Sequence, residues 1–203
     1  MFVDVVIAPD GRTVYAPGGN TVFRIRTATN TAAKPIMIGS DAISVNTLAM
    51  SPNGKTLYVA ASGIVNPRIN FVVPVSTVTN KVGKPIKVGM YPDVIAFIPD
   101  GKTAFVATES AVYPMFSATG KVGRPIRTGF SPLAIVIAPD GRTAWVTGFD
   151  DHRGKNFGAG YLLPISTATD RPGKPVKLGR AASCLIMRPW QRGPAMGPSS
   201  CSL

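Results

Sequence analysis

Residues 99–103 read Pro99-Asp100-Gly101-Lys102-Thr103 and stand between two apolar runs, residues 94–98 and 104–107. An Asp-Gly pair between two β-rich runs is the strongest short-range signal of a β-hairpin, because the turn needs a positive φ that glycine adopts without strain. The same turn recurs at residues 9–13, 52–56 and 139–143. Four copies separated by 43, 47 and 40 residues indicate a repeat architecture.

The first half of each repeat predicts two strands joined by this turn. First strands are expected at residues 3–8, 45–50, 94–98 and 133–138. The second strand carries an aromatic residue at one fixed place, and the four are Tyr15, Tyr58, Phe105 and Trp145. An aromatic that recurs once per repeat is interpreted as packing between repeats rather than as a ligand cage.

The second half of each repeat predicts two more strands. Third strands are expected at residues 21–27, 71–76, 112–117 and 161–166, and Pro74, Pro114 and Pro164 argue against full pairing at one place in them. Fourth strands are expected to begin at a basic residue followed by proline and to end at glycine, over residues 34–39, 84–89, 124–129 and 174–179. No segment shows a sustained helical period.

Four antiparallel strands in each 40–50 residues match the period of a β-propeller blade. We predict an all-β propeller domain over residues 1–189, with blades at about 3–39, 40–89, 90–129 and 130–179. A fifth first strand at 183–189 is expected to lack its blade, which leaves a partial or incomplete ring. Residues 190–203, rich in Pro, Gly and Ser, are expected to form a disordered tail.

Composition narrows the function classes. The 203 residues are 45% hydrophobic and 16% charged, which is typical of a globular chain. No apolar run approaches the roughly 18 residues of a membrane span, and the first residues lack the pattern of a signal peptide, so the chain as written is expected to be cytoplasmic. Cys184 and Cys201 form no CxxC pair and have no neighbouring His, which argues against metal binding through them.

The strand and turn motifs resemble a known repeat. Residues 99–107, together with 57–60, 75–82 and 86–89, resemble the YVTN-type β-propeller repeat, a WD40-like blade, and the resemblance covers residues 1–189. It implies a bacterial or archaeal propeller of about seven blades, located at the surface, in the periplasm or outside the cell, and acting most often as a binding or scaffold module. Related propellers include lactonases and quinoprotein dehydrogenases. Four blades with open edges predict self-association.

The strand order predicts a basic face. The hairpin turns and the turns between third and fourth strands are expected to share one face. This face contains eleven of the 22 Lys and Arg residues but only four Asp residues, and the chain as a whole has a net charge of +12. Such a face suits a polyanion or nucleic acid. The alternative is that these side chains serve solubility and protect strand edges. The candidate nucleic-acid contacts are Lys55, Lys81, Lys84, Lys102, Lys121, Arg124, Arg142 and Lys174.

The opposite face carries the irregular insertions, at residues 61–70 and 148–158, and irregular loops of a repeat protein are where binding residues concentrate. The second insertion contains the only His of the chain in an Asp-Asp-His run, which suits an acid–base or metal cluster but lacks a spaced third ligand. The alternative is a solvated Gly-rich loop. The candidate ligand contacts on this face are Tyr91, Asp93, Phe130, Asp150, Asp151, His152, Arg153 and Arg180.

These observations favour a non-enzymatic propeller that binds an unknown protein or small molecule through its insertion-bearing face. Three alternatives stay open: nucleic-acid binding by the basic face, a lactonase- or quinoprotein-like enzyme centred on Asp150, Asp151 and His152, and a fragment of a longer propeller. The chain has no G-x-S-x-G motif, phosphate loop or dinucleotide fingerprint. No cofactor and no metal are expected.

Overall fold

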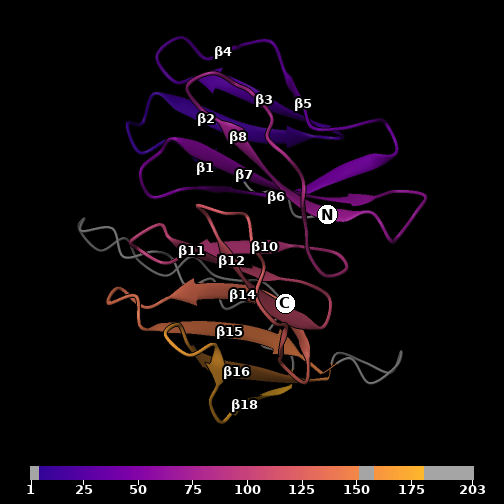
Figure 1. Ribbon diagram of the computed structural model, residues 1–203, viewed down its shortest axis with the longest axis vertical. Helices are drawn as coiled ribbons and strands as arrows, with labels where there is room; N and C mark the ends of the chain where they lie inside the picture. The colour runs from indigo at the N-terminus through magenta and orange to yellow at the C-terminus, as the bar shows by residue number, and fades with distance from the viewer. Residues whose placement is uncertain (1–4, 151–157, 181–203) are drawn as a thin grey trace.

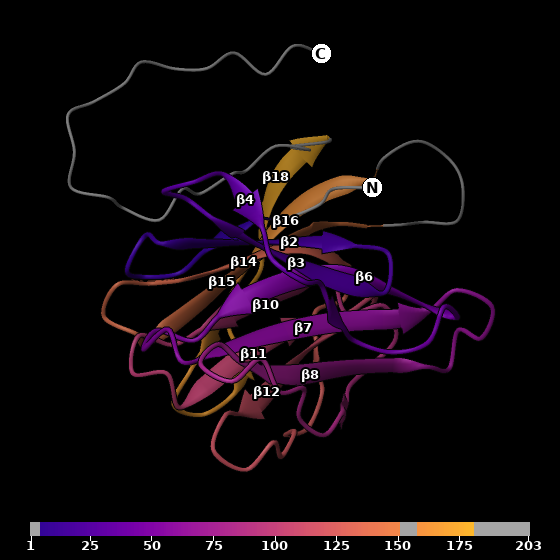
Figure 2. The ribbon, with the colours of Figure 1, turned by 90° about the horizontal axis from the view of Figure 1, so that it is seen from above.

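The computed structural model describes residues 5–150 and 158–180. Within these ranges the chain forms strands and turns, without a helix, arranged as four antiparallel sheets that follow one another in chain order (Figure 1). Figure 2 looks down on them from the end that carries the first sheet. The predicted all-β fold of four-stranded blades is confirmed. The described residues include no helix long and apolar enough to cross a membrane.

The strands of each sheet lie close to their predicted places. The first sheet contains β1 (Val6–Ile7), β2 (Thr13–Gly18), β3 (Thr21–Arg26), β4 (Thr31–Ala32) and β5 (Ile36–Met37). The second contains β6 (Ile43–Met50), β7 (Thr56–Gly63), β8 (Asn70–Ser76) and β9 (Ile86–Lys87). The third contains β10 (Val94–Phe97), β11 (Thr103–Ala107), β12 (Ala111–Phe116) and β13 (Ile126–Arg127). The fourth contains β14 (Ser131–Ile137), β15 (Thr143–Phe149), β16 (Ala159–Ser166), β17 (Arg171–Pro172) and β18 (Val176–Arg180).

The fourth strand of each sheet is shorter than predicted because it is broken near the basic–proline pair. In the first and fourth sheets the chain pairs once before the break, as β4 and β17, and again after it, as β5 and β18. In the second sheet the earlier piece is a single bridge between Val75 and Val82. The third-strand proline lies at the break, where Gly83 N donates to Pro74 O at 2.7 Å. The expected gap in pairing at these prolines is confirmed.

The hairpin turn that defines the repeat has the expected backbone. Its glycine has a φ of 69° at Gly11, 69° at Gly54, 71° at Gly101 and 70° at Gly141. In the third sheet Gly101 N donates to Ile98 O at 2.8 Å, and the Asp100 carboxylate accepts a bond from Lys102 N at 2.8 Å. The Asp therefore holds the turn closed while Gly supplies the left-handed conformation.

A second hydrogen bond, repeated in every sheet, ties this turn to the turn that follows the third strand. A hydroxyl at the end of the third strand donates to the carbonyl of the turn glycine: Thr27 to Gly11 at 2.9 Å, Thr77 to Gly54 at 2.7 Å, Ser117 to Gly101 at 2.7 Å and Thr167 to Gly141 at 2.6 Å. The bond places both turns side by side at one end of each sheet. That end is the basic face expected from the strand order.

The core lies between the sheets, in three apolar layers. The layers contain Tyr15, Tyr58 and Phe105, each at most 4% exposed, between successive pairs of sheets. The predicted packing of these aromatics between repeats is confirmed. Trp145 is only half-buried, because it lies on the side of the fourth sheet that turns away from the third. No later sheet covers that side in the described part of the chain.

The hairpin-turn glycines of the second, third and fourth sheets also fit against the preceding blade. A Cβ added at Gly54 would lie 2.9 Å from Pro9 Cδ, and one at Gly101 would lie 3.3 Å from Pro52 Cδ. The turns therefore stack from blade to blade, and glycine is needed for close approach as well as for its φ. The expected fifth strand and the tail lie outside the described residues, and the domain boundaries stay a prediction.

The repeated hydroxyl bond gives the first test. Thr77→Val removes the donor and leaves the Gly54 carbonyl without it, which should cost about 1 kcal/mol of unfolding free energy and lower Tm by roughly 2–4 °C. Thr77→Ser keeps the hydroxyl and should stay close to the parent in thermal unfolding followed by circular dichroism. Equal melting of the parent and the Val variant would contradict the role of this bond.

Candidate functional site

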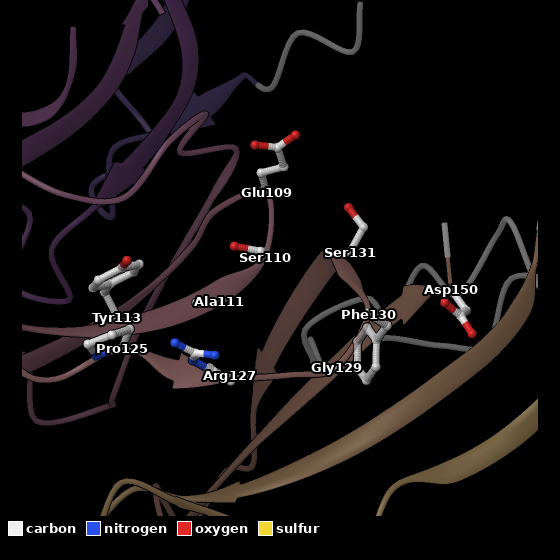
Figure 3. Close-up of a pocket in the computed structure, with 10 residues that line it drawn as sticks. All are labelled: Glu109, Ser110, Ala111, Tyr113, Pro125, Arg127, Gly129, Phe130, Ser131 and Asp150. Carbon is white, nitrogen blue, oxygen red and sulfur yellow. The ribbon is translucent and has the colours of Figure 1, made fainter. Parts of the chain in front are cut away.

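A pocket of about 680 Å³ opens where the third and fourth sheets meet on the insertion-bearing face (Figure 3). The third sheet contributes the turn between β11 and β12, part of β12 and the outer strand β13, and the fourth sheet contributes the connection from β13 into β14 and the residue that follows β15. The polar and aromatic residues that line the pocket are Glu109, Ser110, Tyr113, Arg127, Phe130, Ser131 and Asp150. The pocket therefore combines side chains from two blades.

Phe130 forms the rigid apolar part of the pocket. It is 7% exposed and stacks on Tyr161, with ring centroids 5.6 Å apart and an interplanar angle of 10°. The preceding Gly129 has a φ of 78°, and the Thr128 hydroxyl donates to Phe130 O at 2.5 Å. This short turn fixes the ring where the two blades join.

Gly148 allows the two inner strands of the fourth sheet to approach each other beside the pocket. A Cβ at this position would collide with Ser131 O and with the Phe130 ring. Gly148 pairs with Pro132 across β14 and β15, and Asp150 follows two residues later. The absence of a side chain at Gly148 thus brings the Asp150 backbone next to Ser131 and Phe130.

Glu109 is held by the tight turn between β11 and β12. Thr108 closes this turn, with its N and its hydroxyl both donating to Ala111 O at 2.9 Å. Glu109 N donates to Met90 O at 3.0 Å, which joins the turn to the loop before β10. That loop carries Tyr91, whose φ is 49° and whose N donates to the Asn70 side chain at 2.8 Å.

Asp93 lies in the same neighbourhood. Although the residue as a whole is exposed, protein atoms partly surround its carboxyl. This partial burial is the larger cause, and the negative charge of Glu109 the smaller cause, of a pKa of Asp93 above its usual value. Desolvation and a nearby like charge both disfavour the ionised carboxylate. The two acids thus form an electronegative edge beside the pocket.

The pocket itself mixes charges of both signs. Arg127 is exposed on β13 and supplies a guanidinium, while Glu109 and Asp150 contribute carboxylates. Figure 3 shows Arg127 and Tyr113 on one side of the opening and Ser131, Phe130 and Asp150 on the other. A guanidinium pairs with a carboxylate or phosphate through two parallel bonds, and carboxylates accept bonds from hydroxyls or ammonium groups. The geometry suits a small polar ligand that has an anionic group.

The residues predicted as ligand contacts lie at different places relative to the pocket. Phe130 and Asp150 line the pocket, whereas Tyr91 and Asp93 lie beside it, joined through the Glu109 turn. The backbone of Arg180 pairs with Ala159 at the end of β18. Three of the predicted residues, Asp151, His152 and Arg153, lie outside the described part of the chain.

Arg127 and Glu109 line the pocket but are not among the residues predicted from the sequence. The repeat does mark the position of Arg127. In each outer strand an apolar residue is followed by Met37, Lys87, Arg127 or Lys177, so three of the four equivalent residues are basic. No periodic signal marks Glu109, whose position depends on the length of one turn. Among the described residues, no group of three His, Cys, Asp or Glu side chains could hold a metal ion.

The basic face differs from the pocket in its charge. All eight candidate nucleic-acid contacts are exposed, and none forms an ion pair with an acidic side chain within residues 5–150 and 158–180. A second hollow of about 500 Å³ lies near this face, between the outer strands of the second and third sheets. Lys84 and Lys87 lie at its edge, and Ile86 and Val122 form its apolar part.

Comparison with known proteins supports the fold. No protein-family profile and no curated protein matches this chain. The solved structure of the dihydro-heme d1 dehydrogenase NirN in complex with DHE is similar over 88% of this chain, with a TM-score of 0.63 and 13% sequence identity. This chain spans only 38% of that protein, so the likeness concerns the fold alone. The four blades and this likeness identify a β-propeller fold, while the YVTN-type repeat and the bacterial origin stay predictions.

The raised pKa of Asp93 predicts how stability depends on pH. A carboxyl whose pKa is higher in the folded state stabilises the fold below the unfolded pKa, near 4, and this contribution is lost as the pH rises through the folded value. Asp93→Asn should therefore raise Tm at pH 7 and leave it unchanged near pH 3, measured by thermal unfolding. The control is Asp41→Asn, an exposed acid in the connection between the first and second sheets. A rise in Tm at pH 3 as large as that at pH 7 would refute this origin of the effect.

Proposed function

We propose that this propeller-fold chain is a binding module that takes a small polar ligand with an anionic group into the pocket between the third and fourth blades. The observation that supports it is the arrangement of Arg127, Glu109 and Asp150 around one opening above the fixed ring of Phe130. Pockets with an apolar floor and a few polar groups are the usual form of small-molecule sites.

The side chains that line the pocket offer complementary contacts to such a ligand. Arg127 attracts an anionic group, the carboxylates accept bonds from donor groups elsewhere on the ligand, and the Phe130 ring offers an apolar surface. Ser110 and Ser131 add hydroxyls that can donate or accept. A ligand with an anion at one end and hydroxyl or ammonium groups at the other would match all of these.

The test is a titration of the 203-residue chain with glutamate, glucuronate and inorganic phosphate, followed by calorimetry. Arg127→Gln should weaken binding of the anionic probes at least tenfold, because a charge-assisted hydrogen bond contributes about 1.5–3 kcal/mol. The matched control is Arg124→Gln, an exposed arginine three residues earlier that does not line the pocket. Absence of binding by all three probes, or equal weakening by both variants, would overturn the proposal.

A second candidate function follows from the eight exposed cations of the basic face. If this face binds a nucleic-acid backbone, affinity for a fluorescent DNA duplex should fall by roughly 10³–10⁵ between about 50 mM and 200 mM salt. Replacing Lys55, Lys81, Lys102 and Lys121 by Gln should reduce the slope of that dependence, while Arg127→Gln should not. Affinity that is independent of salt would exclude this function.

A further inference from the structure

The two ends of the blade stack carry apolar faces that the described residues leave uncovered. We call the side of a sheet that turns toward the preceding blade its upstream face, and the side that turns toward the following blade its downstream face. In the inner sheets both faces are packed: β11 alternates between Ala104 and Val106, which meet the second sheet, and Phe105 and Ala107, which meet the fourth. All four residues are fully buried.

The downstream face of the fourth sheet is exposed in comparison. Strand β15 alternates between buried residues, such as Val146 on its upstream side, and half-buried ones on its downstream side. Trp145 and Thr147 are among the half-buried residues, and Val176 beside them is 51% exposed. The equivalent residues of the second sheet, which the third sheet covers, are Tyr58 at 4%, Ala60 at 0% and the half-buried Ile86.

The upstream face of the first sheet is exposed in the same way. Ile7 is 59% exposed and Phe23 is 37% exposed. Val14 and Ile25, which lie in the same cross-strand row as Ile7, are half-buried. At the places of Phe23 and Ile25, the second sheet has Val73 and Val75 and the fourth has Leu163 and Ile165, all at most 2% exposed beneath the preceding blade. In Figure 1 this sheet forms one end of the row and the fourth sheet forms the other.

The repeat makes these two faces complementary. Inside the chain, Tyr15 on a downstream face packs against Leu57 and Val59 on the next upstream face. Trp145 occupies the place of Tyr15, and Val14 and Ala16 occupy the places of Leu57 and Val59. One chain therefore carries both halves of an interface of the kind that it already forms three times.

The hairpin turns lead to the same conclusion. Each turn glycine after the first fits against the proline of the preceding turn, as Gly141 does against Pro99 at 3.2 Å from its added Cβ. Gly11 has no atom of the described chain within 4 Å of that position. Pro139 of the fourth sheet would meet Gly11 if a fourth sheet packed on a first sheet.

The central outward positions of both end faces carry no charge, although the chain has 22 basic residues. Those of the first sheet are Val5, Ile7, Val14, Ala16, Phe23 and Ile25, and those of the fourth are Ala134, Val136, Trp145, Thr147, Leu162 and Val176. Arg171 of β17 lies at the outer edge of the fourth sheet's downstream face, where it pairs with Ser166 and is exposed. Charged residues are depleted at the centres of protein interfaces, and large contiguous apolar faces are usually covered. The faces can therefore meet without burying an unpaired cation.

We propose that a second copy of this chain covers both faces, with the downstream face of each copy packed on the upstream face of the other. The two contacts are identical and heterologous, and together they close a ring of two copies that leaves neither face exposed. The proposal rests on the end sheets and is independent of the ligand pocket.

The first measurement is the mass of the 203-residue chain in solution, by light scattering after size-exclusion chromatography. The proposal predicts twice the chain mass of 21.3 kDa. Mass equal to one chain would overturn it, including the case in which residues 181–203 cover the fourth sheet of their own chain. Mass that rises without limit with concentration would overturn the closed pair.

Two variants then test the direction of the contact. The upstream variant carries Ile7→Asp and Phe23→Asp, and the downstream variant carries Thr147→Lys and Val176→Lys. Each variant alone should be monomeric, because every contact that it could form contains a mutated face. An equimolar mixture should form a 1:1 pair, because one of its two contacts is intact and the other brings the Asp side chains of the first variant against the Lys side chains of the second.

Controls separate loss of pairing from loss of folding. Each variant should keep the far-ultraviolet circular dichroism of the parent, and only a variant that does so is scored. Val78→Asp, at a 77% exposed valine in a turn away from both end faces, should leave the mass of the pair unchanged. A folded upstream variant that still dimerises alone, or a mixture that stays monomeric, would overturn the proposed contact.

Discussion

Packing of each sheet against a neighbour on both sides is the constraint on which the rest of this structure depends. Strand β7 is buried along almost its whole length, because Leu57 and Val59 meet the first sheet while Tyr58 and Ala60 meet the third. A strand buried on both faces must be apolar at successive positions. The repeat satisfies this requirement with aromatic, β-branched and alanine side chains, and its two end sheets have one face each that is packed by no described blade.

The turns carry the second level of organisation. Glycine at positive φ closes each hairpin, its carbonyl accepts the hydroxyl of the neighbouring turn, and its missing side chain leaves room for the proline of the blade before. Three roles for one residue explain why the turn sequence varies so little between repeats. The same arrangement gathers basic side chains at one end of every sheet, so that charge and regular structure share one face.

The opposite face is where the repeat becomes irregular, and the ligand pocket forms there. Gly148 departs from the regular pattern, and together with Gly129, the glycine that ends the fourth strand of the third repeat, it brings Ser131, Phe130 and Asp150 to one opening. Arg127 and Glu109 arrive from the neighbouring blade. The two groups come from neighbouring blades, and only the contact between the third and fourth sheets brings them together.

The sequence by itself determined the all-β fold, the four blades, the turn geometry and the burial of Tyr15, Tyr58 and Phe105, because these follow from local turn chemistry and from side chains that alternate along a strand. It could also suggest Asp150, which stands in an irregular insertion, and Phe130, which stands at the entry into a first strand. Only the tertiary structure decided that Arg127 and Glu109 share a pocket with them and that Trp145 remains half-buried while its counterparts are covered. The physical reason is that these properties depend on which sheet lies beside which, and contacts between distant parts of the chain leave no periodic signal in it.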